Sequence, residues 1–324
     1  MTRTIIDETA FQDAVAAAVL APSLHNSQPW RFRLRADTVE VLVDRDRALP
    51  ASDPTGWAMR IACGAATFNM RLAFAMQGHP VDVRWQPSRG NSAVVAALTP
   101  AAARPASPLE QSLYHAIPRR HSNRQPFWPQ SVPVDARARL VEAARIEAAW
   151  LELVTGTAPV AAVAEIAHAA NQVLRRNASY VAELAAWTRP DEANSDGVPA
   201  RAGGPSPEPQ DLLPQRPFGD RARAPGRDFE PEPLVAVLGT AGNLPSDELC
   251  AGHALERVLL TITDLGLAAS MLSQPIEVPA ARERLRLALG RHGTPQMVLR
   301  IGYGQPGAST PRRGPAEVID ATEA

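Results

Sequence analysis

Two long apolar helices that end alike constrain the fold of this chain more than any other feature. One is expected in SDPTGWAMRIACGAATFNMRLAFAMQG, starting near Asp53 and Pro54 and ending at Gly78. The other is expected in SDELCAGHALERVLLTITDLG, with Ser246 as its N-cap, acidic residues in its first turn and Gly266 as its end. An extended stretch follows each helix, so the repeated order predicts two related halves.

The other segments add strands and shorter helices to both halves. The alternation in WRFRLRADTVEVLVDRD predicts a hairpin that turns near Ala36 and Asp37. Periodicity predicts further strands in VDVRW, AVVAALT, AAWLELVT, PLVAVLGT and PQMVLRIGYG, and helices in FQDAVAAAVLAP, DARARLVEAAR, APVAAVAEIAHAANQVLRRNASYVAELAAW and PAARERLRLALG. At 324 residues the chain exceeds what one simple core usually serves. We therefore expect an α+β fold of two degenerate half-repeats, 1–105 and 106–324, each with a mixed or antiparallel sheet flanked by helices.

The segment 188–233 differs from the rest of the second half. It is rich in proline, glycine and charge, and it is long for a connection without secondary structure. Such a segment is either a flexible insertion or a functional lid. Its composition favours disorder, whereas Leu212, Leu213, Phe218 and Phe229 offer apolar anchors.

The charge and the apolar runs exclude several classes of protein. The net charge is -1 and the pI about 6.7, which argues against a general nucleic-acid binder. No run approaches the roughly 18 apolar residues of a membrane span. The start, MTRTIIDETAFQDAV, lacks the layout of a signal peptide, so the expected location is the cytoplasm.

The sequence contains no lysine, so every positive side chain is arginine or histidine. This absence removes Schiff-base chemistry, pyridoxal phosphate and the P-loop lysine from consideration. The Ala/Arg/Pro bias is typical of a GC-rich genome, which explains the missing lysine without any function. Any anion site must be built from arginine and backbone groups.

Three further patterns indicate structure rather than chemistry. Cys63 and Cys250 lie in helix-like apolar contexts and are expected to be reduced core residues, not a disulfide. The histidines lack metal-type spacing, so no metal site is expected. The stretch GYGQPG (302–307) matches a dinucleotide fingerprint, but the prolines that follow it forbid the required helix.

One proline-bounded loop concentrates positive charge. In IPRRHSNRQPFWPQSVP, Arg119, Arg120 and Arg124 surround His121 and Ser122. This stretch alone is compatible with a solvated basic loop or with a site for an anion. His121 by itself is as compatible with capping the loop as with catalysis.

A second polar loop, APSLHNSQPW (21–30), lies between an expected helix and an expected strand. Polar side chains occur at Ser23, His25, Asn26, Ser27 and Gln28, which is more than a plain turn needs. The loop is either a satisfied buried loop or the polar edge of a ligand pocket.

Together these stretches resemble the FMN-dependent nitroreductase family. The counterparts of the family's motifs are RRHSNRQPF, APSLHNSQPW, LGLAAS, IGYG and PRRGPAEVI. The match spans nearly the whole chain outside 188–233. Its order is unusual, because here the APSLHNSQPW loop precedes the arginine loop and each half keeps the motif that the other lacks. The chain therefore resembles the Acg-like branch, which implies a fused pseudo-dimer with one composite flavin site and a lid.

The resemblance also implies a cofactor site. Arg120 and Ser122 would hold the FMN phosphate and ribityl chain with Arg312 or Arg313, and Arg124 would lie near the N1–C2=O edge of the ring. The full set of expected FMN-binding residues is Pro22, Ser23, Asn26, Gln28, Arg119, Arg120, His121, Ser122, Arg124, Ser273, Gln274, Arg312 and Arg313. No catalytic side chain is implied, because hydride moves between the nicotinamide and flavin N5.

Three functions follow as hypotheses. The first is an NAD(P)H-dependent oxidoreductase of low intrinsic activity that passes electrons to a small acceptor such as a nitroaromatic or a quinone. The second is an FMN-storing or sensing protein without turnover, and the third is a cofactor-free interaction protein. A monomer would suffice for one flavin site, and a homodimer is compatible with the sequence.

Overall fold

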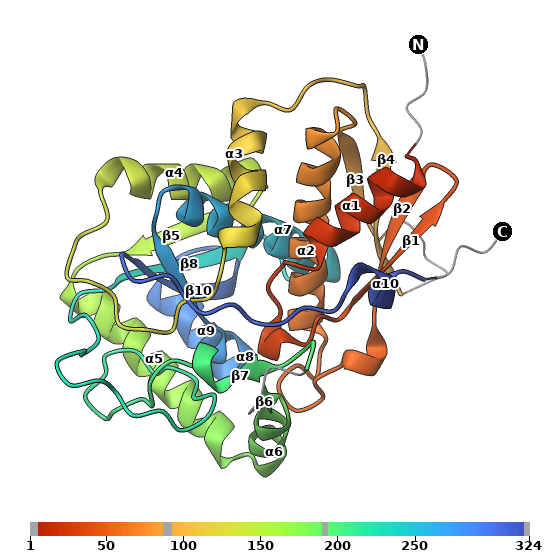
Figure 1. The fold of residues 1–324 in the computed structure, drawn as a ribbon. Coiled ribbons are helices and arrows are strands. Elements are labelled where there is room, and N and C mark those ends of the chain that lie inside the picture. Colours follow the sequence, from red (N-terminus) through yellow and green to blue (C-terminus); the bar gives the residue numbers. More distant parts are fainter. Residues whose placement is uncertain (1–5, 87–92, 190–193, 321–324) are drawn as a thin grey trace.

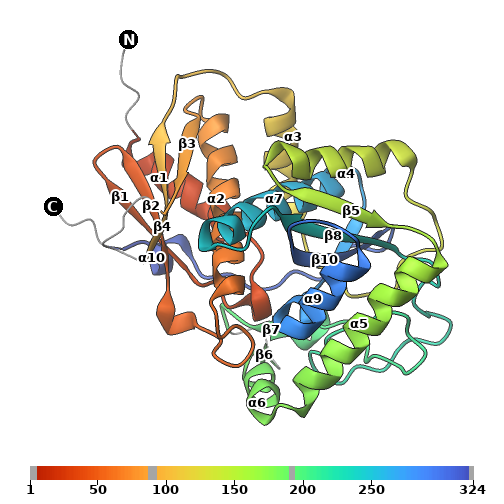
Figure 2. The ribbon, with the colours of Figure 1, turned by 180° about the vertical axis from the view of Figure 1, so that it is seen from behind.

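The computed structural model describes residues 6–86, 93–189 and 194–320, and Figures 1 and 2 show it from opposite sides. The first half consists of α1 (Glu8–Ala18), β1 (Trp30–Arg35), β2 (Thr38–Val43), α2 (Trp57–Met76), β3 (Val81–Trp85) and β4 (Val94–Pro100). Its strands pair antiparallel in the order β1-β2-β4-β3. The predicted hairpin is confirmed, with Ala36 at a φ of 52° in the turn.

The second half contains a sheet of the same strand order. Its elements are α3 (Pro108–Ala116), α4 (Val134–Ile146), β5 (Trp150–Val154), α5 (Thr157–Arg176), α6 (Ala178–Ala186), β6 (Thr188–Arg189), β7 (Val198–Pro199), β8 (Leu234–Thr240), α7 (Pro245–Asp264), β9 (Ala268–Leu272), α8 (Gln274–Glu277), α9 (Pro279–Ala288), β10 (Thr294–Gly302) and α10 (Pro315–Val318). The order β5-β8-β10-β9 again places the first, second, fourth and third strands side by side, all antiparallel. The α+β fold with antiparallel sheets is confirmed.

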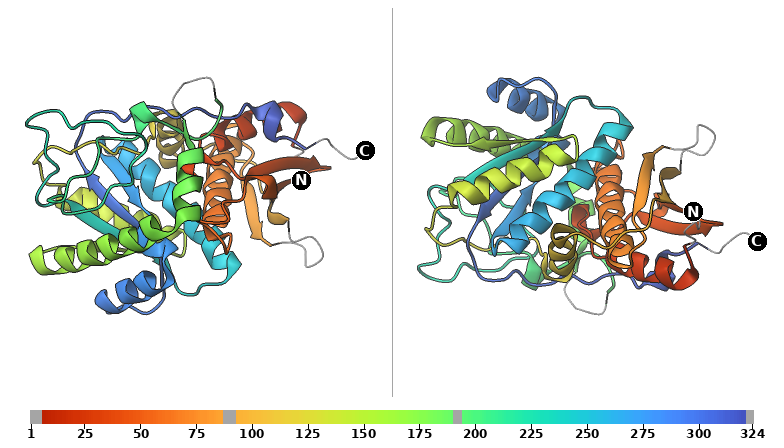
Figure 3. Two further views of the ribbon diagram at one scale, coloured as in Figure 1. Left: turned by 90° about the horizontal axis from the view of Figure 1, so that it is seen from below. Right: turned by 90° about the horizontal axis from the view of Figure 1, so that it is seen from above.

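Helices α2 and α7 pack against each other between the two sheets (Figure 3). Gly64 and Gly252 allow the close approach, because a Cβ atom at Gly64 would lie 2.1 Å from the Leu249 carbonyl oxygen, and one at Gly252 would lie 2.0 Å from that of Ile61. Gly64 and Gly252 are 188 residues apart, and so are Arg60 and its ion-pair partner Glu248. Adding 188 to a position in α2 thus gives the equivalent position in α7. The helix pair is therefore locally two-fold symmetric.

The ends of the two helices were predicted better than their starts. Gly78 and Gly266 follow them with φ values of 78° and 70°, as expected for glycine after a helix. The predicted N-cap at Ser246 is wrong: α7 already begins at Pro245, and the Asp247 carboxylate accepts from the Leu244 N–H at 2.7 Å. Helix α2 likewise begins at Trp57 and not near Asp53.

The C-terminal tail returns from the second sheet to the first. After β10 the chain crosses the molecule to α10, beside β1 (Figure 1). Ile319 forms a parallel bridge with Phe32, and Val318 is buried in the core around α1 and β1. Arg312 and Arg313 lie on this crossing.

The described residues of the segment 188–233, which are 188–189 and 194–233, combine buried stretches, such as 202–205 and 213–216, with an exposed stretch at 224–228. Of the predicted anchors, Leu213 and Phe218 are buried, and Leu212 and Phe229 are half-buried. The part of the predicted segment at 190–193 lies outside the described residues.

Two smaller expectations concern the cysteines and the membrane. Cys63 is a buried free thiol, as predicted, whereas Cys250, also free, is only half-buried. Across the described ranges, the helices are all too short or too polar to traverse a lipid bilayer.

Candidate functional site

Two adjoining cavities lie where the first half, the second half and the C-terminal tail meet. We call one the polar cavity; it is lined by Pro22, Ser23, Asn26, Arg120, His121, Ser122, Arg124, Val198, Met271, Ala308, Thr310 and Arg312. We call the other the apolar cavity; it is lined by Pro22, Ser23, Leu24, His25, Trp57, Ala58, Ile61, Arg124, Pro214, Gln215, Arg216, Phe218, Leu255, Met271, Leu272, Ser273, Gln274 and Met297. Pro22, Ser23, Arg124 and Met271 line both, so the two cavities share a wall.

Residues 118–127, the arginine loop, supply the positive wall of the polar cavity. Ser122 pairs with Ala269 at the start of β9, and the Asn123 N–H donates to the Ala269 carbonyl at 2.8 Å. This attachment fixes the buried Arg120, whose Nη2 donates to the Leu20 carbonyl at 3.1 Å. Arg120 Nε has no hydrogen-bond partner among the described residues. Glu256 Oε1 lies 3.5 Å from this Nε, so an ion pair and not a hydrogen bond holds the guanidinium on that side.

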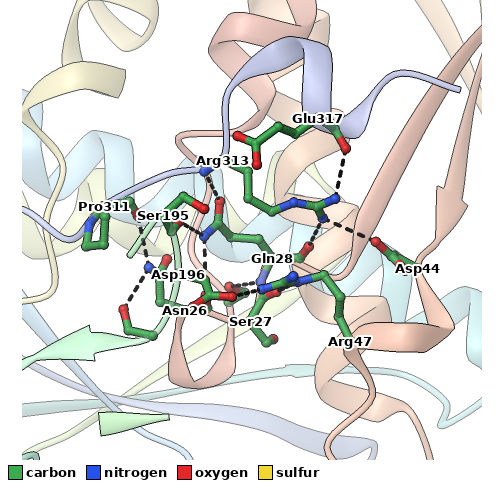
Figure 4. Close-up of polar contacts among 12 residues, drawn as sticks. Asn26, Ser27, Gln28, Asp44, Arg47, Ser195, Asp196, Pro311, Arg313 and Glu317 are labelled. Atoms are coloured by element: carbon green, nitrogen blue, oxygen red, sulfur yellow. Dashed lines mark hydrogen bonds and ion pairs between the residues drawn. The ribbon is translucent and has the colours of Figure 1, made fainter. Parts of the chain in front are cut away.

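Residues 21–29, the Asn26 loop, supply the opposite wall from the first half. His25, Asn26 and Gln28 all have positive φ values, between 51° and 56°. Asn26 Nδ2 donates to the carbonyls of Gly197 and Pro311, each at 2.9 Å (Figure 4). The strained loop is therefore held by the 188–233 segment on one side and by the C-terminal tail on the other.

The two neighbouring arginines of the tail point to different places. Arg312 lines the polar cavity and donates through Nη1 to Asn26 Oδ1 at 2.9 Å. Arg313 instead forms an ion pair with Asp44 at 3.2 Å and donates to the Glu317 carbonyl (Figure 4). Only Arg312 is placed to meet a ligand in the polar cavity.

Positive charge is in excess at the polar cavity. In the described part of the chain, three arginines and no carboxylate line it. Burial, with the neighbouring charge of Arg120, lowers the pKa of Arg312 to about 9, and burial with Arg216 nearby lowers that of Arg124 to about 10. Burial is the main cause of both lowered pKa values, and a bound anion would offset it by stabilising the charged guanidinium groups. The cavity is suited to an anion.

The apolar cavity combines a hydrophobic floor with a few polar groups. The floor comes from the start of α2 and the middle of α7, with Trp57, Ile61 and Leu255. The imidazole of His25 and the amide of Gln215 are buried at its edge, and His25 Nδ1 and Gln215 Nε2 both lack partners within the described ranges. Burial lowers the pKa of His25 well below its usual value, so the imidazole is neutral. This cavity suits an apolar body with polar edges.

Part of the 188–233 segment lines the apolar cavity, through Pro214, Gln215, Arg216 and Phe218. Phe218 lies edge-on to His25 at 5.8 Å between ring centroids, and the Arg124 guanidinium lies 4.8 Å from the Phe218 centroid. Arg216 is anchored beneath, with an ion pair to the buried Glu277 at 2.5 Å and a hydrogen bond to Ser273 Oγ at 3.3 Å. Pro214 to Phe218 are thus part of the wall of the apolar cavity.

Most residues singled out in the sequence lie at the two cavities. Pro22, Ser23, Asn26, Arg120, His121, Ser122, Arg124, Ser273, Gln274 and Arg312 line one or both. Three others do not line either one: Arg119 is exposed, Gln28 bridges the Ser195 carbonyl and the Arg313 N–H, and Arg313 faces Asp44.

Sequence reasoning missed four residues of the site. His25 was noted without a role, and Gln215 and Arg216 belong to a segment with no recognisable pattern. Glu256, an acid in the otherwise apolar middle of α7, is fully buried beside Arg120. A charged residue inside an apolar helix is the signal that would have identified it.

Comparison with known proteins gives relatives along nearly the whole chain. No family model matches the sequence. The chain is 30% identical over 332 residues to the Mycobacterium tuberculosis protein named "Putative NAD(P)H nitroreductase Rv3131", covering 98% of this chain and 93% of that one. It is also 30% identical over 333 residues to "Putative NAD(P)H nitroreductase acg" of the same organism, covering 98% of each.

Solved structures of nitroreductases match part of the chain. The FMN- and NADPH-dependent nitroreductase NfnB of a Sphigopyxis species has a TM-score of 0.42 and 21% identity, covering 64% of this chain and 97% of its own. The FMN-dependent NfnB of Mycobacterium smegmatis, in complex with NADPH, has a TM-score of 0.41 and 18% identity, covering 66% and 100%.

Proposed function

This chain belongs to the nitroreductase family, in its Acg-like branch, and on that premise we propose that it is an FMN-binding oxidoreductase that accepts electrons from NAD(P)H. The observation that carries the proposal is the junction of the two cavities. A cationic pocket lined by Arg120, Arg124 and Arg312 adjoins an apolar pocket with polar edges. FMN has the same division, with a phosphate at one end and a ring system at the other.

The donor set fits the phosphate. A phosphate monoester carries nearly two negative charges at neutral pH, and guanidinium groups bind such oxyanions through paired N–H donors. Arg120 and Arg312 both line the polar cavity, and Nε of each makes no hydrogen bond among the described residues, although Nε of Arg120 lies 3.5 Å from Glu256 Oε1. Arg120, Arg312 and Ser122 would therefore hold the phosphate and the ribityl chain, with Ser23 and Asn26 opposite.

The residues shared by both cavities would hold the ring. When bound, FMN supplies hydride and electron transfer at its ring. Arg124, fixed by its hydrogen bond to the Ala202 carbonyl at 3.0 Å, places a cation at the junction, and a cation there favours the more negative reduced form. Ser273 and Gln274 would border the ring from the start of α8. No side chain of the site is required to act as an acid or a base.

The site is composite, which supports a fused pseudo-dimer. The Asn26 loop comes from the first half and the arginine loop from the second, and the two sheets share one strand order around the symmetric helix pair. The family's homodimers would form two such sites, whereas this chain has one copy of each loop. The expected content is one FMN per chain. Flavin absorbance measured against protein mass checks this value, and two flavins per chain would disprove the composite site.

The reaction is tested by anaerobic titration of the FMN-saturated protein. If the chain is an NAD(P)H oxidoreductase, NADH or NADPH bleaches the flavin absorbance. Protein that stays oxidised with both nicotinamides, yet bleaches with dithionite, would instead be an FMN store. A preparation that binds no FMN would remove both functions.

The residues that cover the apolar cavity favour FMN storage without turnover as the alternative function. Pro214, Arg216 and Phe218 line the cavity from the 188–233 segment, so this segment would restrict access of a nicotinamide or a bulky acceptor. We infer that the segment acts as a lid and that the intact protein turns over slowly.

Opening the lid at one side chain should speed the reduction. Phe218→Ala removes the ring that contacts both His25 and Arg124, and FMN should stay bound because the phosphate site is untouched. Stopped-flow reduction by NADPH is expected to be faster in this variant. The matched control is Phe229→Ala in the same segment, since Phe229 lines neither cavity. Equal rates in wild type and Phe218→Ala, with FMN retained, would rule out a gate at this position.

A further inference from the structure

A carboxylate is buried directly behind the arginine of the polar cavity. Glu256, in the middle of α7, is 0% exposed, and its Oε1 lies 3.5 Å from Nε of Arg120. Among the described residues neither carboxylate oxygen has a hydrogen bond of good geometry, although the neighbouring Asn69 side chain still acts to lower the pKa of Glu256. An ionised carboxylate without hydrogen bonds is costly to bury, so this group is held at the edge of giving up its charge.

The polar groups that face Glu256 come from three elements. Arg120 approaches from the arginine loop, Arg312 acts on it from the tail, and Asn69 borders it from α2. Asn69 Nδ2 donates to the Ala17 carbonyl at 3.2 Å, and its Oδ1 has no donor within the described ranges. The Asn69 side chain, like the two arginines, favours the ionised form of Glu256 and so opposes the effect of burial.

A bound phosphate dianion would change the balance between the protonated and the ionised form of Glu256. Burial raises the pKa of Glu256 to about 7, and the charges of Arg120 and Arg312 work in the opposite direction. A phosphate at these two arginines would engage their charge and repel the carboxylate. Both effects favour the protonated form of Glu256. His121, the other titratable group at the cavity, is kept neutral because burial and Arg120 lower its pKa.

We propose that Glu256 takes up a proton when a phosphate-ended ligand enters the polar cavity, and that this protonation releases Arg120 from its internal ion pair to the ligand. The ligand class is the one given by the proposed function, on which this inference rests. Glu256 is then a positioning residue: it does not touch the ligand, and it holds Arg120 inside the protein while the site is empty. Cofactor binding is thereby coupled to pH.

Proton counting by calorimetry tests the proposal on the wild-type chain. FMN is titrated at about pH 8, above the second phosphate pKa of about 6, in two buffers of different ionisation enthalpy. Uptake approaching one proton per FMN is expected. Riboflavin, which lacks the phosphate, should bind without uptake. Equal proton counts for FMN and riboflavin would overturn the proposal.

The affinity gives a second, independent measurement. Because one proton is taken up, the Kd for FMN should rise by up to about tenfold per pH unit between roughly pH 7.5 and 8.5. In Glu256→Gln the carboxylate is replaced by a neutral side chain of similar shape, so proton uptake and the rise in Kd should both disappear. Glu248→Gln is the matched control and should keep both, because Glu248 is a second buried carboxylate of α7 and lines neither cavity.

The outcomes separate this inference from the proposed function. FMN binding with the same proton count in wild type and Glu256→Gln would leave the cofactor assignment intact and would reject the role of Glu256. A wild-type chain that binds no FMN would reject the proposed function and this inference together. If Glu256→Gln fails to fold, the wild-type comparison of FMN with riboflavin and the wild-type dependence of Kd on pH decide the question.

Discussion

Arg120→Ala should weaken FMN binding by roughly 30- to 1,000-fold, about 2–4 kcal/mol. Arg120 is buried and lines the polar cavity, and its only carboxylate partner among the described residues is Glu256. Its removal deprives the phosphate of a charge-assisted pair and leaves the Glu256 carboxylate without a close cation. Fluorescence titration of FMN gives the Kd, and flavin retention through gel filtration gives a qualitative check.

The neighbouring arginine provides the control for this variant. Arg119 is exposed and donates through Nε to the His115 carbonyl at 3.1 Å, away from both cavities. Arg119→Ala removes the same charge from the same loop and should leave the Kd nearly unchanged. If both variants lose affinity equally, the loop acts through its net charge and Arg120 is not a specific ligand. If neither variant loses affinity, the polar cavity is not the phosphate site.

Gly64→Ala and Gly252→Ala should each lower the free energy of unfolding by about 3 kcal/mol. The added Cβ would meet a backbone carbonyl oxygen of the facing helix at 2.1 Å or 2.0 Å, so α2 and α7 must move apart. Alanine's better helix propensity, about 1 kcal/mol, offsets only part of this penalty. Because the two contacts are equivalent, the two variants should be destabilised by similar amounts in urea unfolding.

A glycine with space around it tests whether the effect is steric. Gly314 has a φ of -67° and meets only the Glu317 side chain, at 3.4 Å. Gly314→Ala should therefore cost less than about 1 kcal/mol. A large difference between Gly64→Ala and Gly252→Ala would show that the helix pair is less symmetric in stability than in geometry.

The helix ends show which part of the fold is readable from sequence. Gly78 and Gly266 are read correctly because a positive φ after a helix is a local requirement that glycine meets. The start of α7 is misread because Pro245 already has a fixed φ suited to the first turn, and Asp247 caps the helix from inside. Pro245, Ser246 and Asp247 each suit the start of a helix, and the sequence pattern alone does not decide which of them sets it.

The candidate site could likewise be predicted from the sequence only in part. Arg120, Ser23 and Asn26 could be predicted as FMN-binding residues because each belongs to a dense polar motif that resembles one of the family's motifs, and all three line the polar cavity. Arg312 and Arg313 are adjacent and chemically identical, and only the path of the tail decides which one turns inward. Glu256 and Phe218 become part of the site through contacts that span more than ninety residues of sequence. Such long-range contacts leave no local pattern.

The placement of the Asn26 loop and the arginine loop on one chain has a consequence for dilution. When the two walls of a cofactor site belong to separate subunits, lowering the protein concentration separates the subunits and empties the site by mass action. Here the connection through α2 and α3 keeps the walls together at any concentration, because their association is intramolecular. The cofactor can then be lost only by its own dissociation, so the protein would keep its FMN at copy numbers too low to maintain a dimer.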